Sequence, residues 1–192
     1  GSGATTGTFP LSAENHVLSE DLTRELNPGD PELGWLAKSG QLALGYLGDP
    51  ERTARTYPVV DGVRYAVPGD RARLRADGTV ELLGRDSATI NSGGEKIFAE
   101  EVESAIKTHP SVYDCVVSGR PSDQWGNEVV AIVRVRDGHV VDDEALRTEA
   151  ERHIARYKLP KEVLTVDELP RTPYGKVVKG ELQRRYQAER RG

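Results

Sequence analysis

The chain has 192 residues, of which 36% are hydrophobic and 30% charged, a composition typical of a soluble globular protein. Its formal net charge of −5 argues against nucleic acid as a partner, because a surface that binds phosphates needs a basic field. No apolar run approaches the ~18 residues that a helix needs to cross a bilayer. We therefore expect no nucleic-acid partner and no transmembrane segment.

The beginning of the chain suggests that the protein is longer than these residues. The sequence starts at Gly1, contains no methionine and has no signal-like segment. We therefore expect a piece of a longer protein, whose missing part holds half of the active site.

Cys115 is the single cysteine of the chain. It has no partner for an internal disulfide, and the apolar run that follows it indicates a buried strand position. This use of cysteine fits a reducing, cytoplasmic location.

The first half of the chain predicts short strands joined by turns. Apolar runs at 33–37 and 42–44 are typical of strands. Asp49-Pro50 supplies an N-cap and a first-turn proline, so residues 51–56 are predicted to form a short helix.

Two hairpins are expected after this helix. Asp61-Gly62 and Asp77-Gly78 supply the positive φ angles that tight hairpin turns need. Between them, Pro68-Gly69-Asp70 places a carboxylate on a turn. This aspartate either bonds its own backbone or accepts from both hydroxyls of a ribose, as an ionised acid can. Spacing alone leaves both interpretations open.

The segment 84–103 separates two patterns. Arg85 ends a strand-like run, a short polar joint and a Ser-Gly-Gly turn follow, and an acidic amphipathic helix begins at Ala99 or Glu100. Short alternating strands precede this segment, and longer helices and strands follow it. We therefore expect a hinge between two domains, residues 1–85 and residues 86–192.

The second half predicts a small mixed domain. Its expected elements are a helix over 99–109, strands over 112–118 and 129–135, a helix over 142–156 and a strand over 163–166. Helices of this kind would cover a short sheet. The fold class is therefore predicted to be α+β, with a small β-rich subdomain first and an α+β domain second.

Residues 170–176, with the sequence PRTPYGK, place a lysine beside a stiffened turn. Two prolines and a glycine restrict the backbone, and Lys176 follows directly. A cation held in this way suits the stabilisation of negative charge that develops on a phosphate. A lysine that is merely solvated explains the pattern equally well, so the residues alone leave the choice open.

The order of these motifs, from about residue 33 to about residue 187, resembles one family. It is similar to the C-terminal third of adenylate-forming enzymes, specifically of acyl-CoA synthetases, also called fatty-acid–CoA ligases. The resemblance rests on five segments: YAVPGD at 65–70, where the family has Y-x-T-G-D; GR at 84–85; SGGE at 92–95; YKLP at 157–160; and 170–176. It implies that residues 1–85 end the large N-terminal adenylation domain and that residues 86–192 form its mobile C-terminal lid domain.

The resemblance implies nucleotide and hinge roles for particular residues. Asp70 would bind the ribose hydroxyls of ATP, although Val-Pro replaces the usual Arg-Thr before it, and Arg85 would contact the same nucleotide. The hinge residue falls at Ser87, where aspartate or lysine is commoner, and Asp86 is the other candidate. Lys176 would be the catalytic lysine of adenylation.

The resemblance also implies a binding site for coenzyme A. Gly93 and Gly94 would line the pantetheine passage, where a side chain would obstruct the thiol. Trp125 and Tyr157 would stack on the adenine of coenzyme A. For Trp125, packing in the core is an equally open interpretation of the residues alone. No residue is predicted to bind a metal.

The implied reaction has two steps and uses ATP, Mg²⁺ and coenzyme A. A carboxylate attacks the α-phosphate to give an acyl-adenylate and pyrophosphate, and the thiol of coenzyme A then displaces AMP. We expect a fatty or similarly apolar acid as substrate and no activity from these 192 residues alone. Two alternatives stay open: an adenylation domain that loads a carrier protein, and a non-enzymatic lid or interaction module.

Overall fold

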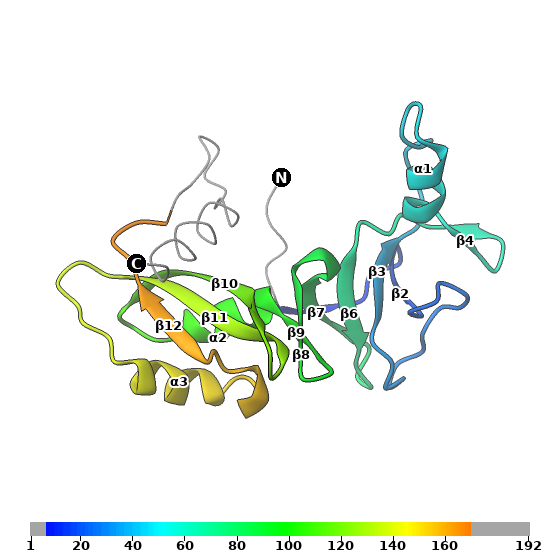
Figure 1. The fold of residues 1–192 in the computed structure, drawn as a ribbon. Coiled ribbons are helices and arrows are strands. Elements are labelled where there is room, and N and C mark those ends of the chain that lie inside the picture. Colours follow the sequence, from blue (N-terminus) through cyan, green and yellow to red (C-terminus); the bar gives the residue numbers. More distant parts are fainter. Residues whose placement is uncertain (1–6, 170–192) are drawn as a thin grey trace. The chain divides into compact units, whose positions relative to one another are not determined.

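The computed structural model describes residues 7–169, and the chain divides into two compact units between Ser87 and Ala88 (Figure 1). Strands dominate the first unit, whereas the second combines strands with two longer helices, so the fold class is α+β as predicted. The structural division lies two residues after the expected boundary at 85/86. The assignment of the units to two domains of a larger enzyme stays a prediction.

The first unit is built on an antiparallel five-stranded sheet with the strand order β1-β7-β6-β3-β2. Its strands are β1 (Gly7–Pro10), β2 (Asn15–Leu18), β3 (Gly34–Lys38), β6 (Asp70–Leu74) and β7 (Thr79–Arg85). Neighbouring residues of a strand point to opposite faces. Accordingly, Val17 and Leu18 belong to two different apolar clusters, one with Leu74 and Val80, the other with Ala37 and Tyr65. No element was predicted for the segment that forms β1 and β2.

The local signals for the short helix and the first hairpin are confirmed. Helix α1 (Pro50–Thr56) begins after Asp49, whose side chain accepts a 2.9 Å hydrogen bond from the amide of Arg52. The hairpin of β4 (Val59–Val60) and β5 (Val63–Arg64) turns through Asp61 and Gly62, with φ angles of 50° and 78°. The turn therefore has the two positive φ angles that Asp-Gly was expected to supply.

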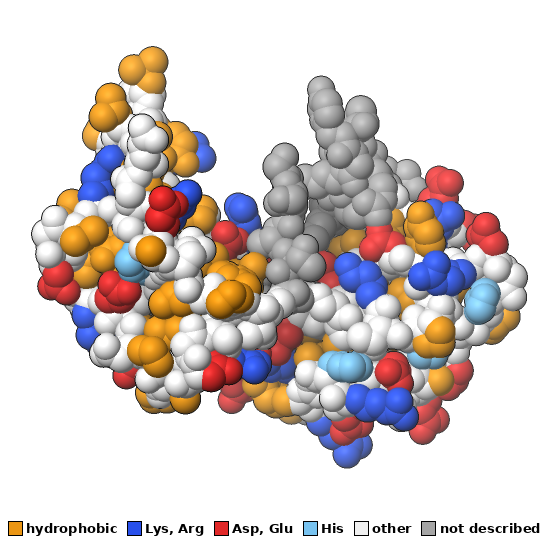
Figure 2. Space-filling model, turned by 180° about the vertical axis from the view of Figure 1, so that it is seen from behind, with side chains coloured by type: hydrophobic (Ala, Val, Ile, Leu, Met, Phe, Trp, Pro, Cys, Tyr) orange, Lys and Arg blue, Asp and Glu red, His pale blue; other side chains and the backbone are white. Residues whose placement is uncertain are grey.

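The strand expected at 42–44 is absent. The guanidinium of Arg64 donates to the carbonyl oxygens of Ala43 and Leu44 at 2.9 and 2.8 Å. These carbonyls therefore bond to a side chain and not to a neighbouring strand. Figure 2 shows hydrophobic side chains on the projection that carries α1, where Leu44 and Leu47 are almost fully exposed. The apolar run predicted a strand, but this segment has no sheet to join.

The second unit is a three-stranded sheet with two helices on one face (Figure 1). Strand β10 (Val112–Ser122) pairs antiparallel with β11 (Gly126–Val135), and β12 (Glu162–Thr165) pairs parallel with β11. Helices α2 (Ala99–Ile106) and α3 (Asp143–Glu151) supply Val102, Ile106 and Leu146 to the core between helices and sheet. Cys115 lies in this core as a free, buried cysteine, which confirms its predicted position.

Both helices end earlier than predicted. In α2, Val102 and Ile106 are fully buried at the expected spacing of four residues, but the helix ends three residues before His109. In α3, Asp142 caps the first turn by accepting from the amide of Ala145 at 3.1 Å. After Glu151 the chain forms a tight turn, so the helix does not continue to residue 156. No helix within residues 7–169 is long and apolar enough to span a membrane.

The segment 84–103 contains a hairpin that was not predicted. A short 3₁₀ turn, η1 (Asp86–Ala88), leads into β8 (Thr89–Ser92) and β9 (Glu95–Phe98), which pair antiparallel. Ile90 and Ile97 face each other across this pair, and both are buried. The polar residues around them concealed this short alternation, so the segment was interpreted as a polar joint.

Candidate functional site

The predicted site residues divide between the two units. Asp70, Arg85 and the hinge candidates Asp86 and Ser87 lie in the first unit. The predicted coenzyme A residues Gly93, Gly94, Trp125 and Tyr157 lie in the second unit. Lys176 lies outside the described residues. Within the units the structure brings together Asp70 and Arg85 in the first and Gly93 and Trp125 in the second.

Asp70 and Arg85 are paired across two neighbouring strands. Their Cα atoms are direct partners in the β6–β7 register, and Arg85 Nε lies 3.1 Å from Asp70 Oδ1. Asp70 is buried, whereas about half of the Arg85 side chain is exposed. The contact is an ion pair without hydrogen-bond geometry, and within residues 7–169 Oδ1 has no hydrogen-bond partner. A buried carboxylate oxygen that lacks a donor is suited to accept one from a ligand.

The turn interpretation of Asp70 is not supported. Asp70 begins strand β6, and no backbone amide of residues 7–169 donates to its carboxylate. In contrast, the amide and hydroxyl of Thr79 both donate to Asp77, the other aspartate beside a turn in this region. Of the two, Asp77 is therefore the one that stabilises a turn.

Arg71 is a buried cation that sequence reasoning missed. Its side chain is 1% exposed, its guanidinium lies 4.1 Å from the centre of the Trp35 ring, and Nη2 donates to Leu33 O at 3.1 Å. Two carboxylates lie further off: Glu20 Oε1 is 3.5 Å from Nη2, and Asp86 Oδ1 is 3.9 Å from Nε. The sequence offered one signal, a charged residue directly after an aspartate that starts a strand.

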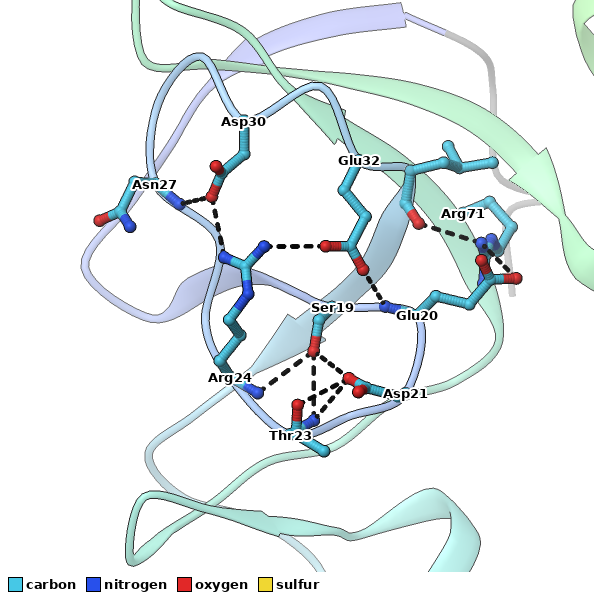
Figure 3. A network of polar contacts seen from close by, with 10 residues as sticks. Ser19, Glu20, Asp21, Thr23, Arg24, Asn27, Asp30, Glu32 and Arg71 are labelled. Carbon is cyan, nitrogen blue, oxygen red and sulfur yellow. Dashed lines mark hydrogen bonds and ion pairs between the residues drawn. The ribbon is translucent and has the colours of Figure 1, made fainter.

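The loop that carries Glu20 is held by a polar network, shown in Figure 3. Glu32 accepts from the backbone amide of Glu20 at 2.8 Å and from Arg24 at 2.9 Å, and Arg24 also donates to Asp30 at 3.0 Å. The hydroxyls of Ser19 and Thr23 donate to Asp21, which lowers the pKa of that carboxyl. The amide of Asn27 and the Arg24 guanidinium lower the pKa of Asp30 in the same way.

Gly93 and Gly94 form the tight turn between β8 and β9. Their φ angles are 59° and 87°, which disfavour any side chain. The amide of Gly93 donates to the carbonyl of Trp125 at 2.9 Å, and a Cβ atom on Gly93 would lie 2.9 Å from Trp125 Cε3. At Gly94 a Cβ atom would meet nothing within 4 Å. The turn therefore explains both glycines, and Trp125 adds a second constraint at Gly93.

Trp125 and Tyr157 are exposed aromatic residues. The exposed fractions are 41% for Trp125 and 50% for Tyr157, so the core interpretation of Trp125 is wrong. The Lys161 ammonium lies 5.6 Å from the Trp125 ring centre. Tyr157 lies in the 3₁₀ turn η2 (Arg156–Lys158), which is anchored to α2 because Lys158 Nζ contacts both oxygens of Glu101 at 2.7 and 2.8 Å. Both rings could therefore receive a ligand without unfolding a core.

Comparison with known proteins shows which family model and which relatives the chain matches. Residues 101–176 match the family model of the AMP-binding enzyme C-terminal domain. The chain is 57% identical over 171 residues to the medium-chain acyl-CoA ligase Mig of Mycobacterium avium, a match that covers 89% of this chain and 31% of that protein. It is 45% identical to the 3-oxocholest-4-en-26-oate–CoA ligase of Rhodococcus rhodochrous, covering 88% of this chain and 30% of that protein.

A solved structure gives a similar result. The ATP-bound crystal structure of MatB from Rhodopseudomonas palustris superposes with a TM-score of 0.73 at 28% identity, covering 95% of this chain and 34% of that one. The chain thus contains an AMP-binding enzyme C-terminal domain. More narrowly, it corresponds to the C-terminal part of relatives named acyl-CoA ligases, which confirms the resemblance found in its motifs. It spans about a third of the length of these relatives.

Proposed function

We propose that this chain is the C-terminal part of an ATP-dependent acyl-CoA synthetase that forms an acyl-adenylate from an apolar carboxylic acid and transfers the acyl group to coenzyme A. The observation that carries the proposal is the buried Asp70 Oδ1 atom, which has no hydrogen-bond donor within residues 7–169 and lies beside Arg85. The names of the relatives support coenzyme A as the acceptor.

On the nucleotide side, Asp70 accepts hydrogen bonds from the two ribose hydroxyls of ATP. Its carboxylate is placed for this because the Arg85 guanidinium lies beside it and still leaves Oδ1 without a hydrogen bond. Arg85 is half exposed and keeps further N–H groups for the nucleotide. The pair positions ATP and takes no direct part in bond making.

On the thiol side, the Gly93-Gly94 turn lines the pantetheine passage, and Trp125 or Tyr157 offers an aromatic face to the adenine of coenzyme A. Both rings are exposed and lie on anchored segments: Trp125 contacts the Gly93 turn, and the turn that carries Tyr157 is held by the Lys158–Glu101 contact. They therefore suit stacking, because the protein need not rearrange to expose them. The positive φ angles leave glycine as the residue that adopts this turn without strain.

Lys176 supplies the cation for the adenylation step. Attack of a carboxylate on the α-phosphate concentrates negative charge, which a positioned ammonium stabilises. The thiol step needs a different surface at the same place, so the second unit presents Lys176 for one step and the Gly93-Gly94 turn for the other. Asp86 and Ser87, at the division between the units, provide the hinge.

Magnesium is assigned to no described residue. Within residues 7–169 no three histidine, cysteine, aspartate or glutamate side chains form a group that could hold a metal ion. When bound, Mg²⁺ neutralises charge on the ATP phosphates. The described residues suit binding of the ribose of ATP and of coenzyme A, and none of them forms a binding site for the metal.

The substrate is a fatty or similarly apolar carboxylic acid. One relative is named for medium-chain acyl groups and another for a steroid acid, and both names describe large apolar acids. We assign no described residue to the acyl group.

The test uses the full-length parent protein. Purified enzyme should exchange pyrophosphate into ATP in the presence of a medium-chain acid and should form the acyl-CoA product when coenzyme A is added, detected by mass spectrometry. Acylation of a carrier protein but not of coenzyme A would replace this proposal by the carrier-loading alternative. Absence of pyrophosphate exchange with a broad panel of acids would support the non-enzymatic alternative. The 192 residues alone should show no turnover.

A further inference from the structure

The buried guanidinium of Arg71 has unused hydrogen-bonding capacity. An arginine carries five N–H donors and cannot give up its charge. Arg71 is 1% exposed, yet Nε and Nη1 have no hydrogen-bond partner within residues 7–169. A buried cation without its full set of hydrogen bonds is unfavourable, so neighbouring groups must supply negative charge.

The two carboxylates near Arg71 lie on different segments, and the first, Glu20, lies on a loop that is fixed to the sheet. Glu20 Oε1 is 3.5 Å from Arg71 Nη2, and the amide of Glu20 donates to Glu32 (Figure 3). The carbonyl of Glu20 also accepts from Trp35 Nε1 at 2.9 Å. Trp35 also lies against the guanidinium of Arg71. One side of the cation is therefore held by the sheet and its polar loop.

The other carboxylate belongs to the linker between the units. Asp86 begins the η1 turn, its amide donates to Gly69 O at 3.0 Å, and its Oδ1 lies 3.9 Å from Arg71 Nε. The Asp86 side chain is 47% exposed, so it can shift without unpacking a core. A bulge between Arg71 and Ala72 lies at the same place in strand β6, where a local twist re-aims side chains.

We propose that Arg71 is a positioning residue of the linker: its buried guanidinium holds Asp86, and with it the end of the linker that belongs to the first unit. The unused Nε donor faces Asp86, so a small shift of this side chain converts the present ion pair into a hydrogen bond. Arg71 thus ties the start of the linker to the strand that carries Asp70. This role deepens the proposed function and rests on it, because it matters only if the second unit changes position during the reaction.

The direct test is a double-mutant cycle on the full chain, with hydrogen exchange of the Asp86 amide measured by NMR. Arg71→Gln and Asp86→Asn should each accelerate this exchange by roughly tenfold, and the double variant should be no faster than the faster single variant, as expected for residues in contact. Arg73→Gln is the matched control, since Arg73 lies on the same strand, is half exposed and pairs with Glu81. Independent, additive effects, or an Arg71→Gln effect no larger than the control, would overturn the proposal.

A second measurement does not depend on removing the buried charge. Asp86→Asn alters an exposed residue, so the fold should persist, and exchange of the Arg71 Nε proton should become faster. An unchanged Nε proton would contradict the pairing. Arg71→Lys keeps the charge but loses the fork of donors. Compared with Arg71→Gln, it should recover more of the free energy of unfolding than of the slow exchange of the Asp86 amide.

The functional consequence is measured in the full-length parent enzyme. Arg71→Gln and Asp86→Asn should shift the ratio of the adenylation rate to the thioester-forming rate in the same direction, while Arg73→Gln leaves it unchanged. Coupled amide exchange with an unaltered ratio would refute the positioning role and leave the proposed function intact. Absence of adenylation in the unmodified enzyme would instead refute the proposed function, whatever the amide exchange shows.

Discussion

The backbone amide of Gly93 donates a 2.9 Å hydrogen bond to the carbonyl of Trp125, and the Trp125 ring occupies the space beside the missing Gly93 side chain. This contact joins the β8–β9 turn to the segment between β10 and β11. The two glycines of the turn share a positive φ angle but differ in this neighbour, which allows their structural roles to be separated.

Gly94→Ala should destabilise the chain by about 1 kcal/mol, because alanine is disfavoured at positive φ but meets no atom there. Gly93→Ala should destabilise it more, since its Cβ atom would also contact Trp125 at 2.9 Å. Denaturant unfolding gives both free energies. In a Trp125→Ala background the excess cost of Gly93→Ala should disappear, and an unchanged excess would show that the ring is not its cause.

Asp70→Asn in the full-length parent protein should weaken ATP binding by about 10- to 100-fold, the range expected when hydrogen bonds to a charged group are lost. The change keeps the shape of the side chain but removes the charge that pairs with Arg85. Calorimetric titration with ATP measures the effect. Asp61→Asn is the control, because Asp61 lies in a hairpin turn whose φ of 50° asparagine tolerates. Equal ATP affinity in both variants would contradict the role of Asp70.

Lys176→Ala in the parent enzyme should lower the adenylation rate by roughly 10²- to 10³-fold, taking the loss of one preorganised electrostatic donor as the measure. Thioester formation from supplied acyl-adenylate should be spared, since that step uses the other surface of the second unit. The two half-reactions are measured separately, with Lys107→Ala, an exposed lysine at the end of α2, as the control. Equal losses in both half-reactions would refute the two-surface assignment.

Asp21 should make the first unit sensitive to acid. Hydrogen bonds from Ser19 and Thr23 lower its pKa below the ordinary value of 3.8, so the folded state favours the ionised form. Its stabilising contribution is therefore complete above pH 3.8 and is lost as the pH falls through the lowered value. Urea unfolding should show Asp21→Ala to be less stable than the unaltered chain at neutral pH, with a difference that shrinks below pH 3.8.

The matched control for this prediction is Asp137→Ala. Asp137 is exposed, and within residues 7–169 its carboxylate makes no hydrogen bond or ion pair. This variant removes an exposed aspartate that lacks such hydrogen bonds, so it should lower the free energy of unfolding at neutral pH less than Asp21→Ala does. A constant difference for Asp21→Ala would show that its hydrogen bonds do not favour the ionised form.

Ile106→Ala should destabilise the second unit by about 2–5 kcal/mol, because Ile106 is fully buried in the main core and its loss leaves a cavity. Val140→Ala, at a residue that is 93% exposed, should change the free energy of unfolding by less than about 0.5 kcal/mol. Both values come from urea unfolding followed by circular dichroism. Similar losses in the two variants would mean that the core does not control unfolding.

Much of the fold follows from local signals in the sequence. Asp49-Pro50 starts α1, Asp61-Gly62 turns the first hairpin, and the spacing of Val102 and Ile106 gives the buried side of α2. These features depend on residues a few positions apart, so a pattern can reveal them. The same holds for the family, because the order of several motifs is a property of the sequence alone.

Other features depend on partners that are distant in the sequence. The run at 42–44 has the composition of a strand but no strand beside it, and Arg64 bonds to its carbonyls instead. The short alternation around Ile90 was concealed until pairing with Ile97 buried both residues. Strand pairing is a long-range interaction, and propensity is a weak guide where a segment is only four residues long.

For the candidate site, the sequence by itself determined which residues to consider: Asp70, Arg85, the Gly93-Gly94 turn, Trp125 and Tyr157. The tertiary structure decided that Asp70 is buried beside Arg85 with an oxygen that lacks a donor, and that Trp125 is exposed against the Gly93 turn. It also revealed the buried Arg71, whose neighbours, among them Glu20 and Asp86, lie on other segments. Burial and charge pairing are set by which segments meet, and only the folded chain brings those segments together.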